Sequence, residues 1–152
     1  MSRGFLKLTF RDDSDGTGKL LVEAEGGGFA GRGGAYFDKL RLESFAGALG
    51  EFPLPDSQAC CLSSGFSSKQ MSGELEQEHV GIDLYPIDNR GHIGVQVRLS
   101  TEVWPDTRPK SHKVVKLEVI TTYQALADFS RDLVAAVRGT ATDAVLRGEM
   151  LP

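Results

Sequence analysis

Two alternating segments on either side of a turn constrain the fold most strongly. Apolar residues occupy every second position of both segments: Val80, Ile82, Leu84, then Val95, Val97, Leu99. The turn sequence Asp88-Asn89-Arg90-Gly91 separates them. Because side chains alternate between the two faces of a strand, the pattern predicts an antiparallel hairpin with one apolar face. Pairing Ile87 with His92 makes opposed residue numbers sum to 179 and places Val80 across from Leu99.

A third strand is predicted at residues 112–121, where Val115, Leu117 and Val119 alternate with polar residues. These three fall on the same apolar face if the third strand pairs with the second so that the numbers of opposed residues sum to 216. That register places Arg98 opposite Glu118 on the polar face. The first register places Tyr85 over Gly94.

The N-terminal half has a similar pattern. Strands are predicted at residues 5–10 and 19–25, and a glycine-rich strand is predicted at residues 29–37. A strand so rich in glycine needs another element packed closely over it, and we expect that element to be a helix. A helix is predicted at residues 39–49, with Asp38 as its N-cap.

The final strand runs directly into a second predicted helix. Thr121-Thr122-Tyr123-Gln124 is a capping-box pattern, and Gly139 provides a stop. Between the halves, residues 56–72 read as a long connection with a short strand near Phe66. Residues 140–152 are predicted to be a C-terminal tail, frayed or with one short helical turn around residues 143–147.

The predicted fold is therefore α+β, with an antiparallel sheet of about six to seven strands. The strands form two β-meander halves, each followed by a helix, and the two amphipathic helices pack on the sheet through Phe45 and Phe129. At 152 residues the chain is expected to form a single domain over residues 1–139, followed by the tail.

Composition excludes several classes of function. A formal net charge of −4 and scattered basic residues argue against nucleic acid as a partner. The chain has no long apolar run and no secretory leader at its N-terminus, so no membrane role is expected. Cys60 and Cys61 are adjacent and cannot readily form a disulfide, which favours a reducing compartment. A cytoplasmic location is therefore expected.

The densest ionisable run is Glu74, Glu76, Glu78 and His79. Strand alternation separates the three glutamates from the histidine, so they do not converge on one ion. The regular strand is expected to start near His79, with the glutamates in its solvated approach. His92 and His112 lie elsewhere. We therefore predict no metal, no cofactor and no catalytic residue.

The polar face of the meander and this acidic run are candidate docking surfaces. An antiparallel sheet commonly leaves one face solvated, so a binding role requires a partner that recognises this face. The predicted binding residues are Glu74, Glu76, Glu78, His79, Asp83, Tyr85, Arg98 and Glu118.

Four segments carry a resemblance to a known family: Gly33-Gly34-Ala35-Tyr36-Phe37, Phe52-Pro53-Leu54-Pro55, Glu74-Leu75-Glu76-Gln77-Glu78-His79, and the strand-to-helix junction Leu117-Glu118-Val119-Ile120-Thr121-Thr122-Tyr123. Over about residues 5–138 the chain resembles the small bacterial WapI-type immunity proteins and related uncharacterised families. The resemblance implies a non-catalytic, cytoplasmic antidote that binds and neutralises a toxin. Its partner would be a basic toxin domain, often a nuclease, or another protein.

Two other classes of function stay open. One is a small-molecule-binding or hydrolytic enzyme with a pocket near residues 56–79, in which Glu76, Glu78 or His79 acts as acid or base. The other is a homo-oligomeric assembly protein, and a homodimer is compatible with either binding role.

Overall fold

The computed structural model describes residues 3–55, 58–67 and 75–149. Two antiparallel meanders form its two sheets, with strand order β3-β2-β1-β8 in sheet A and β4-β5-β6-β7 in sheet B. The elements are β1 (Phe5–Asp12), β2 (Thr17–Gly26), β3 (Phe29–Asp38), α1 (Lys39–Ala48), β4 (Cys61–Ser67), β5 (Leu75–Pro86), β6 (His92–Ser100), a 3₁₀ turn (Pro109–Ser111), β7 (Val114–Thr122), α2 (Tyr123–Arg138) and β8 (Ala144–Arg147).

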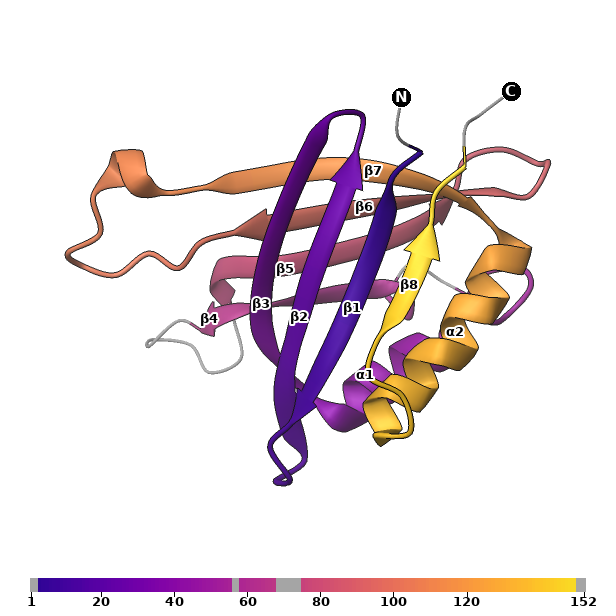
Figure 1. Cartoon of the computed structure of the whole chain (residues 1–152), viewed down its shortest axis with the longest axis horizontal. Helices are drawn as coiled ribbons and strands as arrows, with labels where there is room; N and C mark the ends of the chain where they lie inside the picture. The colour runs from indigo at the N-terminus through magenta and orange to yellow at the C-terminus, as the bar shows by residue number, and fades with distance from the viewer. Residues whose placement is uncertain (1–2, 56–57, 68–74, 150–152) are drawn as a thin grey trace.

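The core lies between the two sheets. Their strands cross at a steep angle, and the two helices lie together beside the crossing (Figure 1). Alternation turns one apolar face of each sheet inward, and both helices add buried side chains. Fully buried residues from these elements include Leu8, Leu20, Ile82, Val97, Phe45 and Phe129. The predicted α+β class is confirmed, and the described residues hold eight strands in two sheets rather than six to seven in one.

The glycines of β3 allow the two sheets to approach closely. A Cβ atom on Gly31 would lie 2.4 Å from Cγ1 of Val115, and one on Gly33 would lie 3.4 Å from Cδ2 of Leu99. Both neighbours belong to sheet B. The prediction that a helix packs over this strand is therefore wrong, because the opposing sheet occupies the space.

The hairpin register is confirmed, because Val80 pairs with Leu99 and Tyr85 with Gly94. The next register is wrong by two residues: Gln96 pairs with Glu118, and Arg98 pairs with Lys116. A shift of two residues leaves every side chain on its predicted face, so the apolar pattern could not distinguish the two registers.

The C-terminal segment joins sheet A. Ala144–Arg147 form β8, which pairs with β1 from Leu8↔Ala144 to Phe5↔Arg147. The predicted helical turn or frayed tail is therefore wrong at these residues. Ala144 and Leu146 are buried and alternate with outward-facing neighbours, but four residues are too few for this period to stand out in sequence.

The two halves exchange their last strands. Each half has the order β-β-β-α-β, yet β4, which follows α1, pairs with β5 of the second half. In the same way β8, which follows α2, pairs with β1 of the first half. Each sheet is therefore completed by a strand from the other half.

The helices differ in how they begin. The side chain of Thr122 caps α2 by accepting a hydrogen bond from the Ala125 N–H at 3.2 Å, and Gly139 ends the helix at φ 87°. Asp38 occupies the N-cap position of α1, as predicted, but its side chain makes no capping hydrogen bond.

Neither helix is long and apolar enough to cross a membrane, judged on the described residues.

Replacing Leu146 with alanine should test the role of β8. Loss of a fully buried leucine in a packed core costs about 2 to 5 kcal/mol of unfolding free energy. Val145→Ala, on the outward face of the same strand, should cost much less. Urea denaturation measures both, and equal small effects would contradict the placement of β8 in the core.

Candidate functional site

A bulge in β5 brings an acidic residue onto the outer face of sheet B. Ser64 pairs with Val80 but Gly65 pairs with Glu78, so His79 is an extra residue in β5. Uninterrupted alternation would turn Glu78 toward the core with Val80. Instead Glu78 lies on the outer face, and His79 is buried at 3% exposure.

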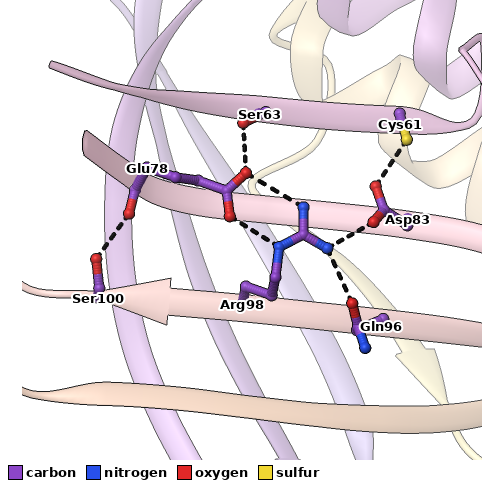
Figure 2. Close-up of polar contacts among 7 residues, drawn as sticks. All are labelled: Cys61, Ser63, Glu78, Asp83, Gln96, Arg98 and Ser100. Carbon is purple, nitrogen blue, oxygen red and sulfur yellow. Dashed lines mark hydrogen bonds and ion pairs between the residues drawn. The ribbon is translucent and has the colours of Figure 1, made fainter. Parts of the chain in front are cut away.

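Arg98 connects the acidic residues of this face (Figure 2). Its Nε donates to Oε1 of Glu78 at 2.8 Å, and its Nη2 donates to Oε2 at 3.2 Å. Its Nη1 donates to Oδ2 of Asp83 at 2.5 Å and to Oε1 of Gln96 at 3.0 Å. One guanidinium therefore holds two carboxylates from the same strand, in the paired geometry that suits arginine.

Two side chains of β4 bind the carboxylates, and one of β6 binds the backbone of Glu78. Ser63 Oγ donates to Oε2 of Glu78 at 2.5 Å, and Cys61 Sγ donates to Oδ1 of Asp83 at 2.7 Å. Ser100 Oγ donates to the backbone oxygen of Glu78 at 2.7 Å. We refer to Cys61, Ser63, Glu78, Asp83, Gln96 and Arg98 as the Arg98 cluster.

Two glycines leave the space that these side chains occupy, because neither carries a Cβ atom. A Cβ atom on Gly81 would lie 2.5 Å from both Nη2 of Arg98 and Oε1 of Glu78. On Gly94 it would lie 2.4 Å from the ring of Tyr85, whose hydroxyl donates to Glu118. The prediction that Tyr85 lies over Gly94 is confirmed.

Electrostatics set the charge of each carboxyl group in the cluster. The hydrogen bond from Arg98 holds the pKa of Glu78 below its usual range. Burial alone would raise the pKa of Asp83, but the hydrogen bonds from Cys61 and Arg98 outweigh it and lower that pKa. Both carboxylates are therefore ionised at neutral pH.

The proton donors of this face are held in their protonated forms. Burial, and then the hydrogen bond to Asp83, raises the pKa of the Cys61 thiol to about 11. Burial and Glu118 raise the pKa of Tyr85. The hydrogen bond to Glu78 raises the pKa of Arg98 despite burial. General acid-base catalysis favours groups that titrate near the working pH, and these shifts move each group away from neutrality.

Most of the predicted binding residues lie on this face. Asp83, Tyr85, Arg98 and Glu118 are on it, and the bulge adds Glu78. Glu76 is exposed, and no ion pair involves it within the described residues. Glu74 lies outside the described residues.

His79 departs from the prediction. Its ring is buried, with Nε2 2.9 Å from Oε1 of Gln77 and an edge-on contact to Phe66 at 4.5 Å between ring centroids. The bulge turned it away from the polar face.

Sequence reasoning missed Cys61, Ser63 and Ser100 as members or supports of the cluster. Cys61 and Ser63 belong to β4, which lies within the region predicted to be a connection. Their only signal in the sequence was the apolar Leu62 between the small residues Cys61 and Ser63.

The described residues include no group of three or more His, Cys, Asp or Glu side chains placed to hold a metal ion. The two closest carboxylates of the cluster, Glu78 and Asp83, share Arg98 instead. A cation would have to displace that guanidinium.

Two open hollows lie near the predicted enzyme pocket. Their volumes are about 400 and 570 Å³, and both are lined by Arg41 and Ser63. Arg41 Nη2 donates to the backbone oxygens of Gln58, at 3.0 Å, and Cys61. Glu76, Glu78 and His79 line neither hollow, so the acid and base residues predicted for an enzyme lie outside both.

Arg98→Met should destabilise the fold in a pH-dependent way. Arg98, Glu78 and Asp83 side chains are 26%, 31% and 31% exposed, so solvent weakens the pairing and the loss should be about 1 to 2 kcal/mol at pH 7. Because the folded pKa values of both acids are lowered, their stabilisation is complete above unfolded values of about 4 and disappears as pH falls through the folded values.

The difference in unfolding free energy between wild type and Arg98→Met should therefore shrink below about pH 4. Arg108→Met, at an exposed loop position, is the matched control and should show no such dependence. Urea denaturation between pH 2.5 and 7 measures the difference, and a gap that does not change with pH would contradict the assigned pairing.

Comparisons with known proteins assign no family to this geometry. No protein-family model matches the chain, and no curated protein or solved structure matches it significantly. Function is therefore inferred from the outer face of sheet B itself.

Proposed function

We propose that the protein is a non-catalytic binding module whose docking surface is the outer face of sheet B. The observation that supports this most is the Arg98 guanidinium, which is held at once by Glu78 and Asp83 on a solvent-facing sheet. Polar groups fixed before binding lose little side-chain entropy when a partner docks. Burial, and then the hydrogen bond to Asp83, raises the pKa of the Cys61 thiol and keeps it protonated, which suits recognition better than nucleophilic chemistry.

The charge of this surface favours a basic partner. Glu78, Asp83 and Glu118 outnumber Arg98 and Lys116, and the whole chain carries a formal net charge of −4. Complementary charge speeds encounter and rejects partners of the same sign. Tyr85, which lies beside Glu118, supplies an aromatic contact of the kind enriched where binding energy concentrates.

A specific role follows from the resemblance to WapI-type immunity proteins. In this proposal the chain is a cytoplasmic antidote that covers a basic toxin domain, such as a nuclease. The adjacent cysteines suit a reducing compartment, and the acidic balance suits a basic toxin. The support for this role is the resemblance together with these two properties of the sequence.

A small-molecule role has one observation in its favour, the pair of hollows that share Arg41. Arg41 could hold an anionic ligand there. Ser63, the hydroxyl common to both hollows, donates to Glu78, so binding fits these hollows better than hydrolysis.

The binding proposal can be tested with purified toxin C-terminal domains encoded in genes that neighbour the gene for this chain. Isothermal titration calorimetry should detect a complex with the wild-type chain. A Glu118→Lys variant should bind at least ten-fold more weakly, because it reverses an exposed charge of the docking face.

Glu51→Lys is the control for a charge change, since Glu51 is exposed in the segment that follows α1 and belongs to neither sheet. It should bind much as the wild type does. Absence of any complex with the neighbouring toxin domains, or equal losses in the variant and the control, would refute docking through this face.

A further inference from the structure

Strand β8 has a free edge whose direction is fixed by its pairing with β1. The Gly148 N–H donates to the Gly4 oxygen at 2.9 Å, so even-numbered residues of β8 face β1. Bonded and non-bonded pairs alternate in an antiparallel ladder. The N–H and C=O groups of Val145 and Arg147 therefore point away from β1.

Each of the other three edge strands has an outward carbonyl that accepts a hydrogen bond within the described part of the chain. The outward carbonyl of Tyr36 in β3 accepts from Ser64 Oγ at 2.5 Å, and that of Cys61 in β4 accepts from Arg41. In β7 the outward carbonyl of Ile120 accepts from the Glu149 N–H at 2.7 Å.

In β8, by contrast with these three carbonyls, no hydrogen bond to the outward groups of Val145 and Arg147 occurs among the described residues. Uncapped edges are templates for another strand, and folded proteins normally protect them.

A groove runs beside this edge. It has a volume of about 590 Å³ and is lined by residues of β8 and its flanks and by Ala125, Asp128, Phe129 and Asp132 of α2. Figure 1 shows β8 as the outermost strand of sheet A, with α2 beside it. Four residues of β8 span about 13 Å, which is room for a short extended segment.

The helix wall of the groove is acidic. Asp128 and Asp132 are one turn apart on α2, and both line the groove. Asp128 pairs only with exposed Arg131, at 3.2 Å, and Asp132 makes no ion pair within the described residues. Arg3 and Arg147 line the strand side. A strand lying in the groove would turn alternate side chains toward the acidic wall.

We propose that the groove between β8 and α2 binds an extended peptide segment of a partner protein by strand addition to β8. Basic side chains at alternate positions of that segment face Asp128 and Asp132. The backbone groups of Val145 and Arg147 supply the hydrogen bonds that give affinity, and the two aspartates supply specificity. This site lies on sheet A and is independent of the docking face on sheet B.

A displayed library of random nine-residue peptides is the probe, selected against the immobilised full chain. Selection should enrich peptides with Lys or Arg at every second position. Val145→Pro removes the outward N–H without touching the bonds to β1, and proline is tolerated at such edge positions. It should weaken the enriched peptides at least ten-fold, whereas Val145→Thr, which keeps the N–H, should bind like the wild type.

Asp132→Lys gives a second, independent readout at an exposed helix position that leaves the fold intact. It should also weaken the basic peptides at least ten-fold. In hydrogen exchange of the wild-type complex, the Val145 and Arg147 amides should gain protection.

Three results would overturn the proposal. The first is that the wild-type chain enriches basic peptides no more than the Val145→Pro variant does in the same selection. The second is enriched peptides that bind both variants as tightly as the wild type. The third is a concentration-dependent dimer that Val145→Pro dissolves, since the edge would then be occupied by a second copy of this chain.

Discussion

The antiparallel pairing of β5 with β6 determines both the core and the polar face of the molecule. With Val80 opposite Leu99, the strand pleat turns the apolar positions of both strands toward sheet A and leaves Asp83, Gln96 and Arg98 on the outer face. A slip of one residue would bury Arg98 and expose the core side chains. The bulge at His79 interrupts this alternation. It places Glu78 on the outer face, where Glu78 contacts Arg98.

Sequence predicted the elements that have a clear period. The β5–β6 register and the bounds of α2 follow directly from alternation, turn residues and caps, and both agree with the structure, whereas β5 begins at Leu75 and not near His79. The sequence pattern could not predict features that depend on which strand lies alongside. The bulge that separates Glu78 from His79 arises opposite β4, and β4 and β8 are short strands recognisable only by what they pair with. The predicted pairing of Arg98 with Glu118 fails for a related reason. Alternation determines which face a side chain occupies, but it does not determine which residue of β7 lies opposite Arg98.

The two proposed surfaces would bind their partners by different physical means. On sheet B, ionised and protonated side chains are held in fixed positions over Gly81 and Gly94, so recognition there rests on charge and shape. On sheet A, the recognition elements are backbone groups at an uncapped edge beside an acidic helix wall. Both follow from the exchange of terminal strands, since β4 contributes Cys61 and Ser63 to one surface and β8 forms the edge of the other.

The rigidity of the Arg98 guanidinium is measurable directly by ¹⁵N NMR of arginine side chains. Four hydrogen bonds to Glu78, Asp83 and Gln96 should slow exchange of the Arg98 Nε–H with water at neutral pH and hinder rotation about the Nε–Cζ bond, which separates the two Nη signals. Arg32, whose side chain is 82% exposed, provides the reference for a mobile guanidinium. Exchange and rotation as fast for Arg98 as for Arg32 would contradict a preorganised docking face on sheet B.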